Sequence, residues 1–133
     1  MPAIKIVLLP KDTNAYGTIF GGVILSHIDL ASAVEARKTA PLRYVTRAMH
    51  EVEFHEPVFL GDVVSFYAET VRIGRTSITV RVSVEAERWS TGPAASGSTG
   101  RGEVVKVTEA VVVLVAVNDQ GRPIPVKSEP MQV

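Results

Sequence analysis

The sequence predicts an α+β fold in which one long helix lies across an antiparallel sheet of about five strands. Residues 23–39 contain neither glycine nor proline and are rich in alanine, leucine and isoleucine, which is typical of a helix. Four later segments are rich in valine, threonine, isoleucine and aromatic residues, which is typical of strands. A chain of 133 residues can form one hydrophobic core, so we expect residues 1–133 to be a single domain.

The first part of the chain is predicted to be a short strand followed by a structured loop. The apolar run from Ile4 to Leu9 ends at Pro10, as a short strand would. Residues 11–22 are rich in glycine and small polar residues, which favours a loop. Its last two residues, Gly21 and Gly22, allow the backbone to approach another group closely.

The predicted helix, residues 23–39, is expected to be buried on most sides. Before Glu35, its polar residues are few and are scattered around the helix, so they form no continuous polar face. Arg37 and Lys38 suit the negative end of the helix dipole, and Pro41 lies just beyond the last turn.

The rest of the chain is predicted to form antiparallel strands joined by short turns at Pro57–Gly61 and Ile73–Arg75. The expected strands are Tyr44–Phe54, Asp62–Arg72, Thr76–Trp89 and Glu103–Val117. The third alternates between apolar and polar residues, which indicates one buried face. The fourth contains an unbroken apolar run from Val111 to Val115, so we expect the helix to cover one face and a second subunit to cover the other.

Two stretches are expected to lie outside the core. Residues 90–102 consist almost wholly of serine, threonine, glycine, alanine and proline, which predicts a mobile loop at a hairpin tip. Residues 127–133 are expected to be a tail.

The composition argues against several functional classes. Lysine plus arginine and aspartate plus glutamate both number 14, and a net charge of zero is unlike that of a nucleic-acid-binding protein. Without cysteine, the chain has no thiolate nucleophile, disulfide or thiolate zinc site, which is compatible with a reducing compartment. No apolar run reaches the roughly 18 residues of a membrane span, and the first residues do not resemble a signal peptide. We therefore expect a cytoplasmic protein with neither a nucleic-acid nor a membrane partner.

Asp29 is the most unusual residue, because a carboxylate in a buried helix is costly unless it is paired or lines a cleft. Ser26 or Ser32 could satisfy it by a hydrogen bond, or it could lie at a subunit contact. Alternatively, it could be catalytic. The backbone N–H groups of Gly21 and Gly22 at the helix start could receive the oxygen of a polarised carbonyl.

Asn14, in the preceding loop, could orient a reactant. Together, Asn14, Asp29 and the helix start provide groups sufficient for acyl hydrolysis. Gly22 and Asp29 are separated by about 10 Å along a helix, too far for both to act on one carbonyl. Two helices packed antiparallel in a two-fold dimer would place the Asp29 of one chain opposite the Gly22 of the other. Two equivalent sites at a dimer interface are therefore predicted.

These residues, together with further short motifs, resemble the acyl-CoA thioesterases of the hot-dog fold. The closest resemblance is to the short bacterial acyl-CoA hydrolases related to the brain-type enzyme, and it covers about residues 5–126. The motifs are Asp12-Thr13-Asn14, Gly17, Ile19-Phe20-Gly21-Gly22, Asp29, Phe54-x-x-Pro57, Gly61-Asp62-Val63-Val64, Gly74-Arg75-Thr76-Ser77, Thr108-Glu109-Ala110 and Val115-Ala116-Val117.

The resemblance implies hydrolysis of an acyl-CoA to CoA and a free carboxylic acid. Asp29 would be the family carboxylate, acting as a general base on water or as a nucleophile that forms a mixed anhydride. Asn14 would come from the opposite subunit, and the N–H of Gly22 would hold the thioester oxygen. The resemblance also implies a homodimer and, in the larger assembly, a hexamer built as a trimer of dimers. No cofactor is expected besides the CoA of the substrate.

The turn at Gly74 is a candidate for binding the phosphates of CoA, since the matching turn lies near the nucleotide in the resembling family. Arg75 would supply a cation, and Thr76 and Ser77 would supply hydrogen-bond donors. A simple hairpin turn with a solvated arginine explains Arg75 equally well.

The histidines are assigned no catalytic role. His27 lies on the opposite side of the helix from Asp29, and His50 and His55 are not spaced to complete a metal site, so no metal is expected. A hydratase or dehydratase on the same fold would need His27 or His55 beside Asp29. A non-catalytic acyl-CoA-binding or sensor module is a further alternative. Trp89 is expected at a subunit contact rather than along the acyl tunnel.

Overall fold

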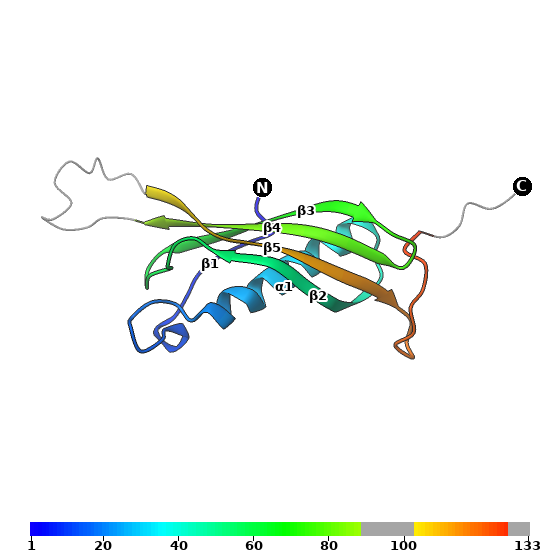
Figure 1. Ribbon diagram of the computed structural model, residues 1–133, viewed down its shortest axis with the longest axis horizontal. Helices are drawn as coiled ribbons and strands as arrows, with labels where there is room; N and C mark the ends of the chain where they lie inside the picture. The colour runs from blue at the N-terminus through cyan, green and yellow to red at the C-terminus, as the bar shows by residue number, and fades with distance from the viewer. Residues whose placement is uncertain (89–102, 128–133) are drawn as a thin grey trace, which may run out of the picture.

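The computed structural model describes residues 1–88 and 103–127, which form one five-stranded antiparallel sheet with a long helix against one face (Figure 1). The predicted α+β fold is therefore confirmed. In chain order the elements are β1 (Ile4–Val7), the 3₁₀-helix η1 (Pro10–Asp12), α1 (Gly21–Thr39), β2 (Arg43–Phe54), β3 (Val63–Ile73), β4 (Ser77–Arg88) and β5 (Glu103–Val117). The bounds of β1, α1, β2, β3 and β5 lie within two residues of the predicted ones. The predicted last residue of β4 lies outside the described residues.

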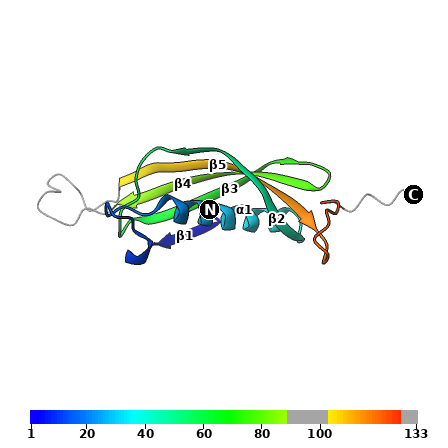
Figure 2. The same ribbon diagram turned by 60° about the horizontal axis from the view of Figure 1, so that its bottom comes forward.

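The strand order is β1-β3-β4-β5-β2, and every pair is antiparallel. α1 runs lengthwise along the sheet and packs mainly against β3 and β4, as Figure 2 shows after a rotation of 60°. At one edge, β2 pairs only with β5, so its other side has no strand beside it among the described residues. An unpaired strand edge can pair with another chain unless charges, bulges or a covering element prevent it.

The core lies between α1 and the facing side of the sheet. The predicted alternation of β4 is confirmed, because Ile78, Val80, Val82 and Val84 are all fully buried. α1 contributes one buried stripe at the spacing of a helical face, made of Ile24, Ile28, Ala31, Ser32 and Ala36. The apolar members of this stripe share one hydrophobic cluster with Phe66 of β3, the largest of the fully buried residues.

The expectation that α1 is buried on most sides is wrong for the single chain. Leu30 is 55% exposed and Val34 is 41% exposed, because the sheet covers only one side of the helix. On β5, Val111 is buried, whereas Val113 and Val115 are half-buried on the face away from α1. Cover of that face by a second subunit stays a prediction.

The predicted mobile loop at 90–102, Trp89 and residues 128–133 of the predicted tail lie outside the described residues. In the described part of the chain, no helix is both long enough and apolar enough to cross a membrane.

Candidate active site

Asp29 lies at the middle of α1 on the side that faces β2. Its side chain is half-buried, and its Oδ1 accepts a hydrogen bond from the Oγ1 of Thr46. The predicted partners are not used, since the hydroxyl of Ser26 donates to the carbonyl of Val23 at 2.8 Å and that of Ser32 to the carbonyl of Asp29 itself at 2.7 Å. Oδ2 of Asp29 has no hydrogen-bond partner among the described residues, so it can receive a proton or attack an electrophile.

Thr46 is a site residue that the sequence did not reveal. It pairs with Leu114 of β5, and this register turns its side chain toward α1. The sequence places Thr46 on a strand, but only the register of β2 against β5 and the position of α1 bring its hydroxyl to Asp29.

Gly21 and Gly22 form the first turn of α1, as expected. Phe20 precedes them with an extended backbone, and no side chain caps the helix. A Cβ at Gly22 would lie 2.6 Å from the ring of Phe20, whereas one at Gly21 would meet only Phe54, at 3.6 Å. Within the described residues the N–H of Gly22 has no acceptor, and it lies at the positive end of the helix dipole. It can therefore donate to an anionic oxygen.

Asn14 holds the loop before the helix in shape. Its Oδ1 accepts the backbone N–H groups of Tyr16 at 2.8 Å and Thr18 at 3.2 Å, and its Nδ2 donates to the hydroxyl of Thr18 at 2.8 Å. One hydrogen of Nδ2 has no acceptor among the described residues. The side chain is thus mainly a brace for this loop, with a single donor available to a reactant.

The predicted site residues do not meet within one chain. Gly22 begins α1 and Asp29 lies seven residues further along, which corresponds to about 10 Å. The Arg75 turn is further away still, because it lies between β3 and β4 near the end of α1, at the opposite end of the molecule from the two glycines (Figure 1).

The Arg75 turn is a hairpin whose backbone is tied to the C-terminal part of the chain. The carbonyl of Thr76 accepts the N–H of Ala116 at 2.8 Å, and that of Arg75 accepts the N–H of Val126 at 2.9 Å. The side chain of Arg75 is exposed, and Ser77 packs so close that a Cβ at Gly74 would lie 2.8 Å from its hydroxyl. The turn can offer a cation and hydroxyl groups to an anion, but it does so at a distance from Asp29 in the same chain.

His27 turns away from Asp29, as predicted. Its Nδ1 lies 2.8 Å from the carbonyl of Val23, and its ring stacks on Phe66 with the ring centroids 5.7 Å apart. The imidazole therefore faces β3, whereas the Asp29 carboxylate faces β2.

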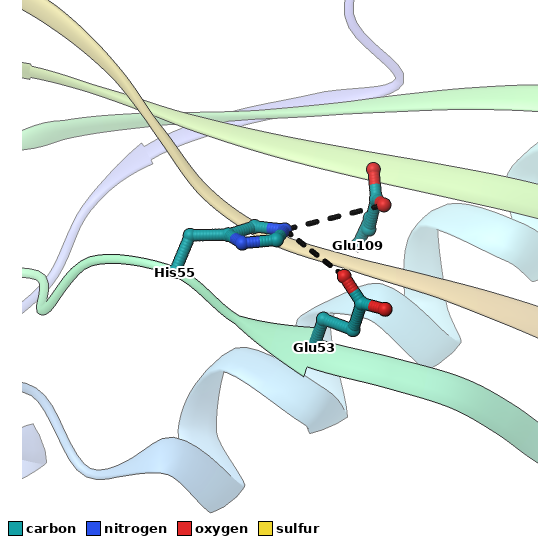
Figure 3. A group of neighbouring side chains, drawn as sticks. All are labelled: Glu53, His55 and Glu109. Atoms are coloured by element: carbon teal, nitrogen blue, oxygen red, sulfur yellow. Dashed lines mark ion pairs between the residues drawn. The ribbon is translucent and has the colours of Figure 1, made fainter.

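His55 lies between two carboxylates from neighbouring strands, a group that the sequence did not reveal (Figure 3). Its Nε2 is 3.5 Å from Glu53 and 4.0 Å from Glu109, and the three possible metal-ligating atoms lie within 4.8 Å of one another. Lys106 also pairs with Glu109, and this hydrogen bond holds the pKa of the Glu109 carboxyl below its usual value of 4.5. These ion pairs are sufficient to explain why the three partly exposed side chains lie together.

His50 faces away from α1 and shares a groove of about 550 Å³ with three arginines of the outer sheet surface, Arg47, Arg72 and Arg81. Neither it nor His55 contacts Asp29 in the described structure. The site thus has a carboxylate held by a threonine, a donor at a helix start and a braced asparagine.

Known proteins are similar to this chain in sequence and fold. The family model described as Thioesterase superfamily matches residues 16–89. Acyl-CoA thioester hydrolase YciA of Salmonella typhimurium is 37% identical over 122 residues, covering 92% of this chain and 86% of the relative. Cj0915, a hexameric hotdog fold thioesterase of Campylobacter jejuni, is 46% identical, with a TM-score of 0.85 over 95% of this chain and 90% of that one. HI0827, a hexameric broad specificity acyl-coenzyme A thioesterase, is 36% identical, with a TM-score of 0.83 over 96% and 82%. The chain therefore belongs to the Thioesterase superfamily, among the acyl-CoA thioester hydrolases of the hot-dog fold.

Proposed function

We propose that this protein hydrolyses acyl-CoA thioesters to CoA and a carboxylic acid, at sites that two subunits share. The observation that carries the proposal is the arrangement of α1. Among the described residues, one carboxylate oxygen of Asp29 and the N–H of Gly22 have no partner, and the two groups are too far apart to serve one carbonyl. The relatives named above are thioesterases, which supports the reaction class.

A two-fold dimer with antiparallel helices would complete each site. It would bring the Asp29 of one chain beside the Gly22 of the other. The same two-fold axis would bring one chain's Arg75 toward the partner's helix start, because Arg75 and the helix start lie at opposite ends of each subunit. The phosphates of CoA could then bind beside the thioester.

In the general-base route, Oδ2 of Asp29 takes a proton from water as the water oxygen attacks the thioester carbonyl carbon. The carbonyl oxygen becomes an oxyanion that the Gly22 N–H stabilises, and the C–S bond then breaks to release the CoA thiolate. In the nucleophilic route, Oδ2 attacks the carbonyl carbon itself, the thiolate leaves, and water hydrolyses the mixed anhydride. In both routes the Thr46 hydroxyl holds Oδ1, which leaves Oδ2 to react. Asn14 would steady the water or the carbonyl with its remaining N–H.

The alternatives have less support. A hydratase or dehydratase would need a histidine beside the carboxylate, and both His27 and His55 face elsewhere. A binding module without activity would need to bind acyl-CoA but would not need the Thr46 contact to Asp29. We also propose that three dimers assemble into a hexamer, because two of the solved relatives are described as hexameric. Sedimentation should then give the mass of six chains.

The test is release of free thiol from a panel of acyl-CoAs. The protein has no cysteine, so a thiol reagent reports only on the CoA that is released. Asp29→Asn should lower kcat by about 10² to 10⁴-fold. Asp119→Asn is the matched control, because the Asp119 side chain is 89% exposed in a surface ion pair. No turnover of any acyl-CoA by the wild type would refute the activity, and full activity of Asp29→Asn would refute the role of Asp29.

Sharing of the site has its own test. Mixed dimers of Asp29→Asn with Asn14→Ala subunits should recover activity, since one of the two sites then contains both intact residues. Verified mixed dimers that stay as inactive as the parents would contradict a shared site.

A further inference from the structure

The pre-helix loop, residues 13–20, is held by a second loop, residues 57–62, which we call the clamp loop. The N–H of Ile19 donates to the carbonyl of Val58 at 2.8 Å, and a β-bridge joins the two loops at the neighbouring position. Both of these residues are buried. Because α1 begins directly after the pre-helix loop, the position of the Gly22 N–H depends on the clamp loop.

The clamp loop is fastened in turn by an ion pair between Asp62 and Arg88, the last residue of β4. Arg88 Nε donates to Asp62 Oδ2 at 3.1 Å, and the two side chains are only 22% and 6% exposed. The same Oδ2 accepts the N–H of Phe59 at 2.9 Å. Arg88 also donates to the carbonyl of Pro57, and its guanidinium carbon lies 4.6 Å from the centroid of the Phe59 ring. One arginine thus contacts both ends of the clamp loop.

We infer that Asp62 and Arg88 are positioning residues for the active site, acting on Gly22 through the clamp loop and the pre-helix loop. The inference rests on the proposed function, in which the Gly22 N–H binds the thioester oxygen. Such a donor must lie within about 3 Å of the oxyanion, and a displacement of about 1 Å can cost as much as 100-fold in rate. Neither loop belongs to a helix or strand, so the position of the clamp loop depends on this ion pair as well as on the backbone contacts between the two loops.

The test uses substitutions that release the clamp loop and leave the core intact. Arg88→Met keeps the apolar stem and removes every guanidinium contact. Asp62→Asn can still accept the Phe59 N–H through its Oδ1, but it loses the charge that pairs with Arg88. Arg81→Met is the matched control, because Arg81 lies on the same strand and points to the outer face.

Two readouts separate positioning from a general loss of stability. In hydrogen exchange by mass spectrometry, Arg88→Met should speed exchange of residues 15–22 by about tenfold and leave residues 28–36 of α1 within about twofold of the wild type. In thiol release, kcat should fall by about tenfold while KM changes less than about twofold, because the displaced donor acts on the transition state. Arg88→Lys, which restores a cation, should recover part of both effects.

Unchanged exchange in residues 15–22 of Arg88→Met, or equal acceleration across α1 as well, would overturn the inference, and so would a kcat like that of the wild type. The outcomes for the proposed function are distinct. If the wild type turns over no acyl-CoA, the proposed function fails, and the exchange measurement still decides whether the ion pair holds the helix start.

Discussion

The contact between Thr46 and Asp29 gives the sharpest test of the proposed chemistry. Thr46→Val removes the hydroxyl that donates to Oδ1 of Asp29 and keeps the shape of the side chain. The carboxylate then loses its only hydrogen-bond donor among the described residues. We expect it to rotate more freely and to spend less time with Oδ2 directed at the substrate.

The size of the effect follows from the exposure of the pair. A hydrogen bond to a charged group contributes about 1.5–3 kcal/mol, and the lower end applies because Thr46 is exposed and Asp29 only half-buried. A loss of about 1.4 kcal/mol in the transition state corresponds to about a tenfold fall in kcat/KM. The unfolding midpoint should change little, since the hydroxyl lies outside the core.

The assay is thiol release from acyl-CoA by the wild type, Thr46→Val and Thr46→Ser, with Thr79→Val as a control on the outer face of β4. Serine should restore most of the activity because it keeps the hydroxyl. If valine stays within about twofold of the wild type, or if serine is as slow as valine, the hydroxyl does not hold the reacting carboxylate.

Two further outcomes follow from packing. Gly22→Ala should lower kcat/KM far more than Gly21→Ala. A Cβ at Gly22 would lie 2.6 Å from the phenylalanine ring before the helix, whereas a Cβ at Gly21 would make only an ordinary contact at 3.6 Å. Equal kcat/KM values for the two variants would contradict this. Thr108→Val should leave the unfolding midpoint unchanged or raise it by a few degrees, because the buried Oγ1 of Thr108 has no hydrogen-bond partner among the described residues. A large fall in that midpoint would show that the hydroxyl is satisfied.

Local patterns predicted most of the fold. The helix ends at Thr39 as expected, because its last turn is basic and a proline follows at position 41. β5 spans the expected residues because it is rich in valine, which favours strands. The expected burial of α1 on most sides was wrong for the single chain, since an apolar sequence does not say which element covers it. Leu30 and Val34 are exposed because no element of the described structure covers their side of the helix.

Parts of the site were also visible in the sequence. Asp29 was distinctive as an acid in an apolar helix, and Gly22 as a glycine at a helix start. The partner of Asp29 was not visible: the neighbouring serines were the local candidates, but both hydroxyls bind backbone carbonyls. Thr46 is 17 residues away from Asp29, and nothing in the strand's own pattern marks it.

The sequence by itself determined the elements, the carboxylate and the glycine helix start, because these depend on neighbours within a few residues along the chain. The tertiary structure alone decided that β2 turns Thr46 toward Asp29, and that Arg88 fastens the clamp loop 31 residues before it at Pro57. It also separated Gly22 and Arg75 to opposite ends of the molecule. Such relations depend on strand order and register, which are set by the packing of the whole sheet against one helix rather than by any local pattern.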